Sequence, residues 1–119
     1  MMLALILALL AQPASAKGPL HVRVPNGIVD LHDQYVLCQD DKFDVARVRD
    51  LADFRRETER AIDACASEKA FLAKAADARL ARTPDHADPV MRRKAIAEAF
   101  DGYDRVRRAM AAGQGTPSR

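Results

Sequence analysis

Apolar side chains recur every three or four residues along three stretches of this chain, which is the spacing of one face of an α-helix. The first stretch predicts a helix over residues 28–39, after a turn signal at 24–27 and an extended arm over 17–27. His32 is expected on the outer, solvent-facing side of this helix. The predicted buried face consists of Ile28, Leu31, Tyr35 and Cys38, widened by Val36 and Leu37.

A longer stretch with the same period predicts a second helix over residues 50–82, with Asp50 as its N-cap. The connection at 40–49 is left open between a loop and a helical turn, because its Asp residues favour turns while its apolar residues suit either. The buried face of this second helix consists of Leu51, Phe54, Thr58, Ile62, Cys65, Leu72, Ala76 and Leu80.

Two charged residues, Glu68 and Lys69, interrupt that apolar face about midway along the second helix. One interpretation is that the face shifts to Phe71 or Ala73, while the charged heads reach solvent on their flexible stems. The other is a polar contact from these residues to the first helix or to a partner. The first interpretation is favoured.

The third stretch predicts a helix over residues 89–112, bounded by proline and glycine signals. Pro84 ends the second helix, Asp88 caps the third, and Gly113 suits its C-terminal end. The link between the two helices is short, so we expect antiparallel neighbours with Phe100 packed against the second helix. Gly102 either admits a close neighbour or is tolerated on the surface. The buried face of the third helix consists of Ile96, Ala99, Phe100, Tyr103, Val106 and Met110.

Composition limits this chain to one small domain. It has 119 residues, 49% apolar and 30% charged, with a net charge of +2. The near balance of charge gives no reason to expect a specific nucleic-acid partner. No stretch alternates with the period of a strand. We therefore predict an all-α fold over 28–112, either a small helical hairpin or a three-helix bundle, followed by a disordered tail at 113–119.

Residues 1–16 predict a secretory signal peptide. They carry no charged side chain, residues 1–11 are all apolar, and Ala14-Ser15-Ala16 supplies the small residues of a cleavage site. No Lys or Arg precedes the run, so an uncleaved anchor or a helix of the fold is the alternative. The run is shorter than the ~20 residues of a membrane span. We expect an exported chain, periplasmic or secreted, with no transmembrane segment after cleavage.

The two Cys residues, Cys38 and Cys65, both lie on predicted buried faces. Export exposes them to an oxidising compartment, where a pair normally forms a disulfide. Their separation of 27 positions differs from the Cys-x-x-Cys spacing of redox sites, so we predict a structural disulfide between the first and second helices. The bond also requires the second helix to begin near Asp50, because a connection ending at Asp44 would be too short to bring the sulfur atoms together.

Candidate metal and catalytic groups are few, and no cofactor is expected. Asp85, His86 and Asp88 could touch an ion, but a polar capping turn explains the same residues. The acidic cluster at 40–44 lacks the Gly and the terminal Glu of a calcium loop. No Ser, His and acidic set suited to nucleophilic catalysis stands out.

The predicted third helix has six basic and three acidic residues. Asp101 and Asp104 each lie four residues before an Arg and can pair with it, so a solvated face is the favoured interpretation. A contact with an anion or a partner is the alternative. The residues considered for that contact are Arg92, Arg93, Lys94, Arg105 and Arg108, with Arg107 beside them.

Together these patterns favour a small exported binding or structural protein without enzymatic activity, which contacts a protein partner through a helical face. Two other hypotheses stay open: a small helical enzyme built on Arg and Glu pairs, and an anion or envelope-surface binder that uses the basic third helix. A concave site where Arg and Glu converge would favour the enzyme. An Arg-rich face with few carboxylate partners would favour the binder.

Overall fold

The computed structural model describes residues 21–113 of the chain. The expected signal peptide at 1–16, the first part of the expected arm at 17–20 and the expected tail from 114 onward lie outside the described residues. Over residues 21–113 the chain is helical and contains no strand, so the predicted all-α fold class is confirmed. Within residues 21–113, none of the helices combines the length and the hydrophobicity that a membrane span requires.

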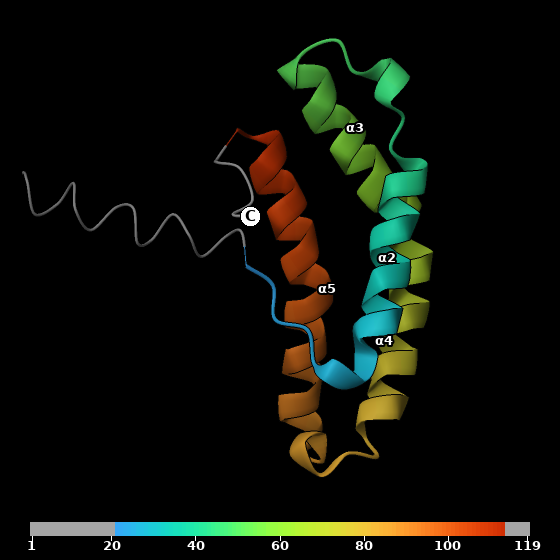
Figure 1. Cartoon of the computed structure of the whole chain (residues 1–119), viewed down its shortest axis with the longest axis vertical. Helices are drawn as coiled ribbons and strands as arrows, with labels where there is room; N and C mark the ends of the chain where they lie inside the picture. Colours follow the sequence, from blue (N-terminus) through green and yellow to red (C-terminus); the bar gives the residue numbers. More distant parts are fainter. Residues whose placement is uncertain (1–20, 114–119) are drawn as a thin grey trace, which may run out of the picture.

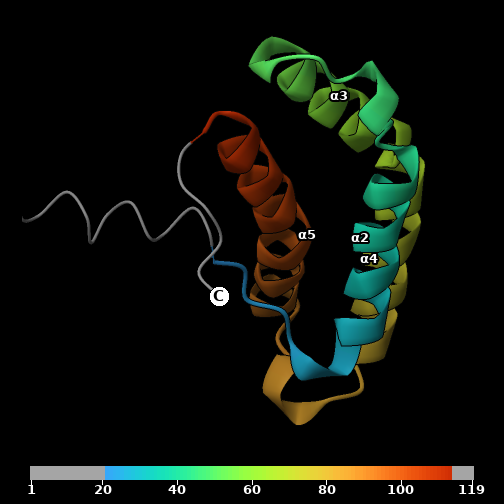
Figure 2. The same cartoon turned by 45° about the horizontal axis from the view of Figure 1, so that its top comes forward.

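Helices pack together with short 3-10 turns before and between them. The α-helices are α2 (Val29–Lys42), α3 (Leu51–Ala64), α4 (Ala66–Leu80) and α5 (Pro89–Ala111), and the 3-10 turns are η2 (Asn26–Ile28), η3 (Val45–Arg47) and η4 (Pro84–His86). Figure 1 shows α5 beside the pair formed by α2 and α4. Figure 2 shows α3 leaning across the end of the bundle towards the C-terminal end of α5.

The first helix is longer than predicted at its C-terminal end. α2 reaches Lys42, and it is entered through η2, so the extended arm ends at Pro25. The open segment 40–49 is therefore helical up to Lys42 and then forms a loop that contains η3. The Asp44 side chain accepts a backbone N–H within η3, which is the turn role expected of Asp.

The predicted second helix begins where expected but is broken at Cys65. The Asp50 carboxylate accepts the backbone N–H of Asp53 at 2.8 Å and caps α3. Cys65 leaves the helical conformation, with φ −99° and ψ 8°, and separates α3 from α4. No Pro or Gly lies between residues 50 and 82, so the local sequence does not cause the break. The break occurs where the disulfide holds the chain and α3 turns towards α5.

The chain reverses between α4 and α5 through the link at 81–88, as the proline signals predict. Asp88 accepts the backbone N–H of Val90 and caps α5, with a proline as the first helical residue. α5 ends at Ala111, and Gly113 follows with φ 73°, the left-handed conformation that favours glycine after a helix. The colours of Figure 1 show that α4 and α5 run in opposite directions, as predicted.

The core lies where α2, α4 and α5 meet. Phe100 of α5 is 1% exposed, and its ring centroid is 5.6 Å from that of Tyr35 on α2. Leu72 of α4 belongs to the same cluster, so the predicted burial of Phe100 near the second helix is confirmed. The buried members of the cluster are Ile28, Leu31, Tyr35, Cys65, Leu72, Ala76, Leu80, Ile96, Ala99 and Phe100.

Two predictions about the faces of α2 are wrong. His32, expected on the outer side, is 8% exposed, and its Nε2 lies 2.9 Å from the Ala99 carbonyl oxygen of α5. Leu37, expected to widen the buried face, is 65% exposed. The reason is that α2 packs against both α4 and α5, which rotates the buried sector towards His32 and leaves Leu37 on the opposite side of the helix from Tyr35.

Candidate functional site

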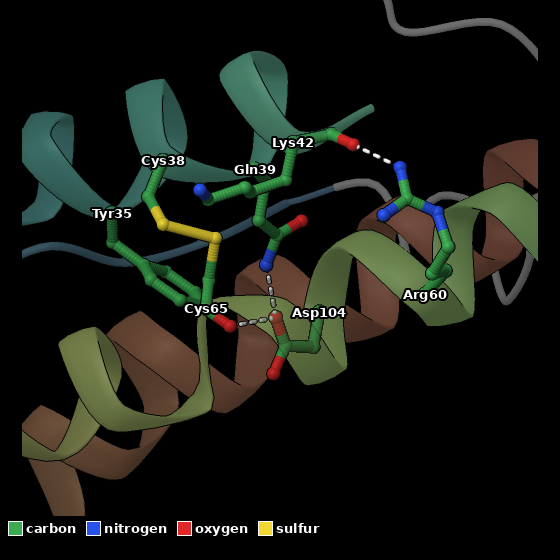
Figure 3. The surroundings of a disulfide bond; sticks show 7 residues. All are labelled: Tyr35, Cys38, Gln39, Lys42, Arg60, Cys65 and Asp104. Atoms are coloured by element: carbon green, nitrogen blue, oxygen red, sulfur yellow. Dashed lines mark hydrogen bonds between the residues drawn. A yellow bond between two sulfur atoms is a disulfide. The ribbon is translucent and has the colours of Figure 1, made fainter. Parts of the chain in front are cut away.

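The predicted disulfide between Cys38 and Cys65 is present and adjoins a polar cluster in the interior (Figure 3). It joins α2 to the break between α3 and α4, with Cα atoms 6.1 Å apart, a normal separation for a disulfide. Cys65 is fully buried and Cys38 is half-buried. In the chain-entropy model a cross-link over this length of chain stabilises the fold by about 3.5 kcal/mol.

Asp104 of α5 is the central acceptor of this polar cluster. It is 3% exposed, and its Oδ1 accepts a hydrogen bond from the Tyr35 hydroxyl at 2.6 Å and from the Gln39 amide at 2.7 Å (Figure 3). Its Oδ2 accepts a hydrogen bond from Lys69 Nζ of α4 at 2.8 Å. One buried carboxylate therefore joins α2, α4 and α5.

Lys69 has polar partners, which explains why a charged residue interrupts the apolar face of the predicted second helix. Its ammonium group pairs with Asp101 and Asp104 of α5. Partial burial opposes the charge, but the two carboxylates raise the pKa of Lys69 above its usual value. The contact is thus to the predicted third helix rather than to the first. The favoured shift of the face is wrong for Phe71, which is 70% exposed, but Ala73 does pack against the core. Of the two charged residues only Glu68 is exposed.

Tyr35 and Gln39, the other side chains that donate to Asp104, are buried and inaccessible to a ligand. Burial and the Asp104 carboxylate raise the pKa of the Tyr35 phenol, which therefore stays a hydrogen-bond donor at neutral pH. Gln39 is fully buried, and its Oε1 has no donor among the described residues. A satisfied carboxylate in this setting fixes the relative positions of three helices, so its role is structural.

A second polar cluster fastens the loop between α2 and α3. Glu57 is 4% exposed, pairs with Arg60 and accepts the backbone N–H of Asp44 at 2.8 Å. These two partners lower the pKa of the Glu57 carboxyl to about 2. The Arg60 guanidinium also donates to the carbonyl oxygen of Lys42 at the end of α2 (Figure 3).

Most basic residues considered for an anion contact are used within the protein. Arg92 is well buried, and besides its carboxylate partner it donates to the carbonyls of residues 86 and 87. Arg93 and Lys94 differ, because both are exposed and neither forms an ion pair within residues 21–113. The pairs formed are Arg92–Asp77, Arg105–Glu98, Arg107–Asp40 and Arg108–Glu59.

The local ion pairs predicted along α5 are therefore wrong. Asp104 turns inward to the polar cluster, so Arg108 pairs instead with Glu59 of α3 at 2.7 Å. Asp101 pairs with Lys69 of α4. Asp101, Asp104 and Arg108 have interhelical partners in place of the neighbours one turn away, because packing places Asp104 on the buried face of α5, four residues after Phe100. Arg105 pairs with Glu98 of α5 itself.

A groove of about 700 Å³ lies between the arm, residues 21–25, and α5, and we call it the arm groove. The arm crosses α5 over Gly102, where an added Cβ would lie 3.5 Å from the Val22 side chain. Gly102 therefore has the close neighbour that the sequence left open. The apolar lining of the arm groove is Val24, Pro25, Met91, Ala95 and Ala97, and the charged lining is Arg23, Lys94, Glu98, Asp101 and Arg105.

A second groove, of about 410 Å³, lies between α4 and α5, and we call it the α4–α5 groove. It shares Ala97 and Asp101 with the arm groove, so the two grooves flank one face of α5. Its lining residues are Lys69, Ala73, Lys74, Asp77, Arg93, Ile96, Ala97, Phe100 and Asp101.

The candidate metal ligands take part in turns and caps. Asp88 caps α5, and His86 Nδ1 lies 3.4 Å from the Thr83 hydroxyl in the link. In the acidic cluster at 40–44, Asp40 pairs with Arg107 and Asp44 caps η3. Within residues 21–113, no three His, Cys, Asp or Glu side chains converge as a metal site would require.

Sequence reasoning missed the roles of several residues of these sites, among them Asp104, Lys74 and Arg23. Asp104 carried a readable signal, because an acid four residues after Phe100 falls on the same face of the helix. Lys74 and Arg23 carried none, since only tertiary packing brings α4 and the arm beside α5.

Comparison with known proteins adds no relative: no family model matches the chain, and neither a curated protein nor a solved structure matches it.

Proposed function

We propose that this protein is an exported, non-enzymatic binding module whose helical domain is held by one disulfide. The Cys38–Cys65 bond carries the proposal, because it joins the only two Cys residues of the chain. Structural disulfides persist mainly in oxidising compartments. The uncharged apolar run at 1–11 and the small residues at 14–16 supply a matching export signal.

The use of polar side chains supports binding over catalysis. The buried carboxylates, such as Asp104 and Glu57, are occupied by contacts between elements of the fold. The two grooves are lined by apolar residues and by charged residues, most of which are exposed. Such open surfaces suit a contact with a partner, and they offer little shielding from water for a reacting group.

A second candidate is a small enzyme that uses Glu98 and Arg105, which both line the arm groove and lie 3.1 Å apart. This is the convergence of Glu and Arg that would favour catalysis. Both side chains are 42–49% exposed, so water screens the pair, and the binding role is preferred. Should an activity be detected, Glu98→Gln must abolish it for this candidate to stand.

Cell fractionation tests the export proposal. The full chain is expressed with its own leader in a host with a periplasm, beside Leu7→Arg, which places a charge in the apolar run. The wild-type chain should reach the envelope fraction with its thiols oxidised, and Leu7→Arg should stay in the cytoplasm with both thiols reduced. Cytoplasmic wild-type chain with free thiols would refute the proposal.

A further inference from the structure

We infer that the face of α5 between the arm groove and the α4–α5 groove binds an anionic phospholipid surface through Arg23, Lys74, Arg93 and Lys94. This inference rests on the proposed function, since it names the partner of the exported module. Of the basic residues first considered on α5, it retains only Arg93 and Lys94 and adds one cation from the arm and one from α4.

Four unpaired cations surround the two grooves. Arg23 and Lys94 line the arm groove, while Lys74 and Arg93 line the α4–α5 groove. All four side chains belong to exposed residues, and none forms an ion pair within the described part of the chain. They come from the arm, α4 and α5, so the tertiary structure gathers them.

The acidic residues of the same grooves all have basic partners. Each one pairs with a basic side chain of the protein, and the pairs are Asp77–Arg92, Glu98–Arg105 and Asp101–Lys69. Lys69 is shared with Asp104, so Asp101 keeps part of its negative charge, but with six basic and three acidic residues the lining of the two grooves is positive overall. A surface of this kind attracts phosphate groups, and each Lys or Arg near an anionic membrane contributes about 1 kcal/mol, or about fivefold in affinity.

Exposed apolar side chains accompany these cations. Val90 and Met91, in the first turn of α5, are 63% and 58% exposed, and Met91 also lines the arm groove. Val90 and Lys94 lie one turn apart on the same face as Ala97. Apolar side chains flanked by Lys and Arg are typical of surfaces that enter the headgroup region of a bilayer.

An acidic protein segment is the main competitor, because it would use the same cations. The lipid surface is favoured for two reasons. Arg23 and Lys94 line the arm groove together with exposed Met91, and a bilayer can cover these charged and apolar side chains together. The site also consists of two separate grooves flanking α5, whereas an extended peptide is usually held in one continuous groove or at a sheet edge.

Vesicle sedimentation tests this inference with a charge-matched control. The exported protein, with its N-terminus recorded by mass, is mixed with vesicles of phosphatidylglycerol and phosphatidylcholine in equal parts, or of phosphatidylcholine alone. The Arg93→Gln/Lys94→Gln variant should bind the anionic vesicles about 20-fold more weakly than wild type. The control, Arg55→Gln/Arg82→Gln, removes two exposed cations elsewhere that also lack ion pairs, and it should stay within about twofold of wild type.

Three results would overturn the inference. The two variants could lose affinity for the anionic vesicles equally, or the wild-type protein could bind neutral and anionic vesicles equally well. The wild-type protein could also bind polyglutamate, a model acidic segment, but not the vesicles. Thermal unfolding of both variants should match wild type, because none of the four substituted side chains makes an ion pair within residues 21–113. If the protein is exported and oxidised but does not bind the vesicles, the lipid-binding inference is wrong and the proposed function still stands. If the chain stays reduced in the cytoplasm, the proposed function itself is wrong.

Discussion

The Tyr35 hydroxyl of α2 donates a 2.6 Å hydrogen bond to the Asp104 carboxylate of α5, across 69 positions of sequence. With Gln39 and Lys69 as further donors, this acid links three of the packed helices beside the disulfide. Hydrogen bonds to a buried charge are strong, and their loss is costly because the remaining partners stay desolvated.

Replacing this acid should therefore be strongly destabilising. We expect Asp104→Ala to lower the free energy of unfolding by about 3–5 kcal/mol, since it leaves buried donors and the Lys69 charge without their partner. Asp101→Ala, which removes the more exposed acid bound to Lys69, should cost no more than about 1 kcal/mol. Urea unfolding of both variants measures the difference, and similar values for the two would contradict a structural role for Asp104.

The packing of Phe100 leads to a second prediction with an internal control. Phe100→Ala should lower the free energy of unfolding by about 3–5 kcal/mol, because it leaves a cavity between α2, α4 and α5. Phe71→Ala removes the same ring from a residue that is 70% exposed, and it should change stability by about 0.5 kcal/mol or less. Equal melting temperatures for wild type and Phe100→Ala would show that this ring is not packed in solution.

Helical periodicity predicted the face of α5 around Phe100, and cap chemistry predicted the starts of α3 at Asp50 and of α5 at Asp88. Periodicity could not predict the break at Cys65, because residues 50–82 are all compatible with one continuous helix. The break depends on contacts with distant elements. The prediction that His32 faces solvent was wrong for the same reason, since its burial depends on a contact with a carbonyl of α5.

The polar cluster around Glu57, which fastens the loop between α2 and α3, predicts how stability changes with pH. In the folded protein Arg60 and the Asp44 backbone N–H lower the pKa of Glu57 to about 2, and Arg49 and Arg56 lower that of Asp53 to about 2. Unfolded Asp and Glu carboxyls titrate near ~4, so the unfolded state binds more protons in between. Their stabilisation is therefore fully present above pH ~4.5 and is lost as the pH falls towards ~2.

Urea unfolding at pH ~7, ~4 and ~3 checks this dependence. The Glu57→Gln variant should lose stability less steeply than wild type over the acidic range, because one of the two depressed carboxyls no longer titrates. Asp63→Asn, which alters an exposed acid without an ion pair within the described residues, should follow the wild-type curve. Parallel curves for Glu57→Gln and wild type would show that the Glu57 carboxylate does not stabilise the folded protein in this way.

Gly102 gives a prediction about the arm. An added Cβ would meet Arg105, Glu98 and Val22 at 3.4–3.5 Å, which is ordinary contact, so Gly102→Ala should stabilise the fold by up to about 1 kcal/mol through its better helix propensity. Gly102→Leu should instead displace Val22 and release the arm. Tryptic cleavage after Arg23 should then be faster in Gly102→Leu than in Gly102→Ala, and equal rates would mean that the arm does not pack over this position.

The candidate surface was only partly predictable from sequence. Arg93 and Lys94 stood out as a basic cluster, but so did Arg105 and Arg108, and only the structure shows that the latter two have interhelical or local acidic partners. Whether a cation is free for a ligand depends on which carboxylates packing brings within reach, and a one-dimensional pattern contains that information only for neighbours along a helix.

The intact mass of the protein isolated from cells under non-reducing conditions tests the central claim most directly. We predict a chain that begins at Lys17, after cleavage behind Ala16, and that lacks the two thiol hydrogens of Cys38 and Cys65. Reduction should restore both hydrogens. A mass that includes Met1 to Ala16, or one that keeps both thiol hydrogens, would contradict an exported module held by a disulfide.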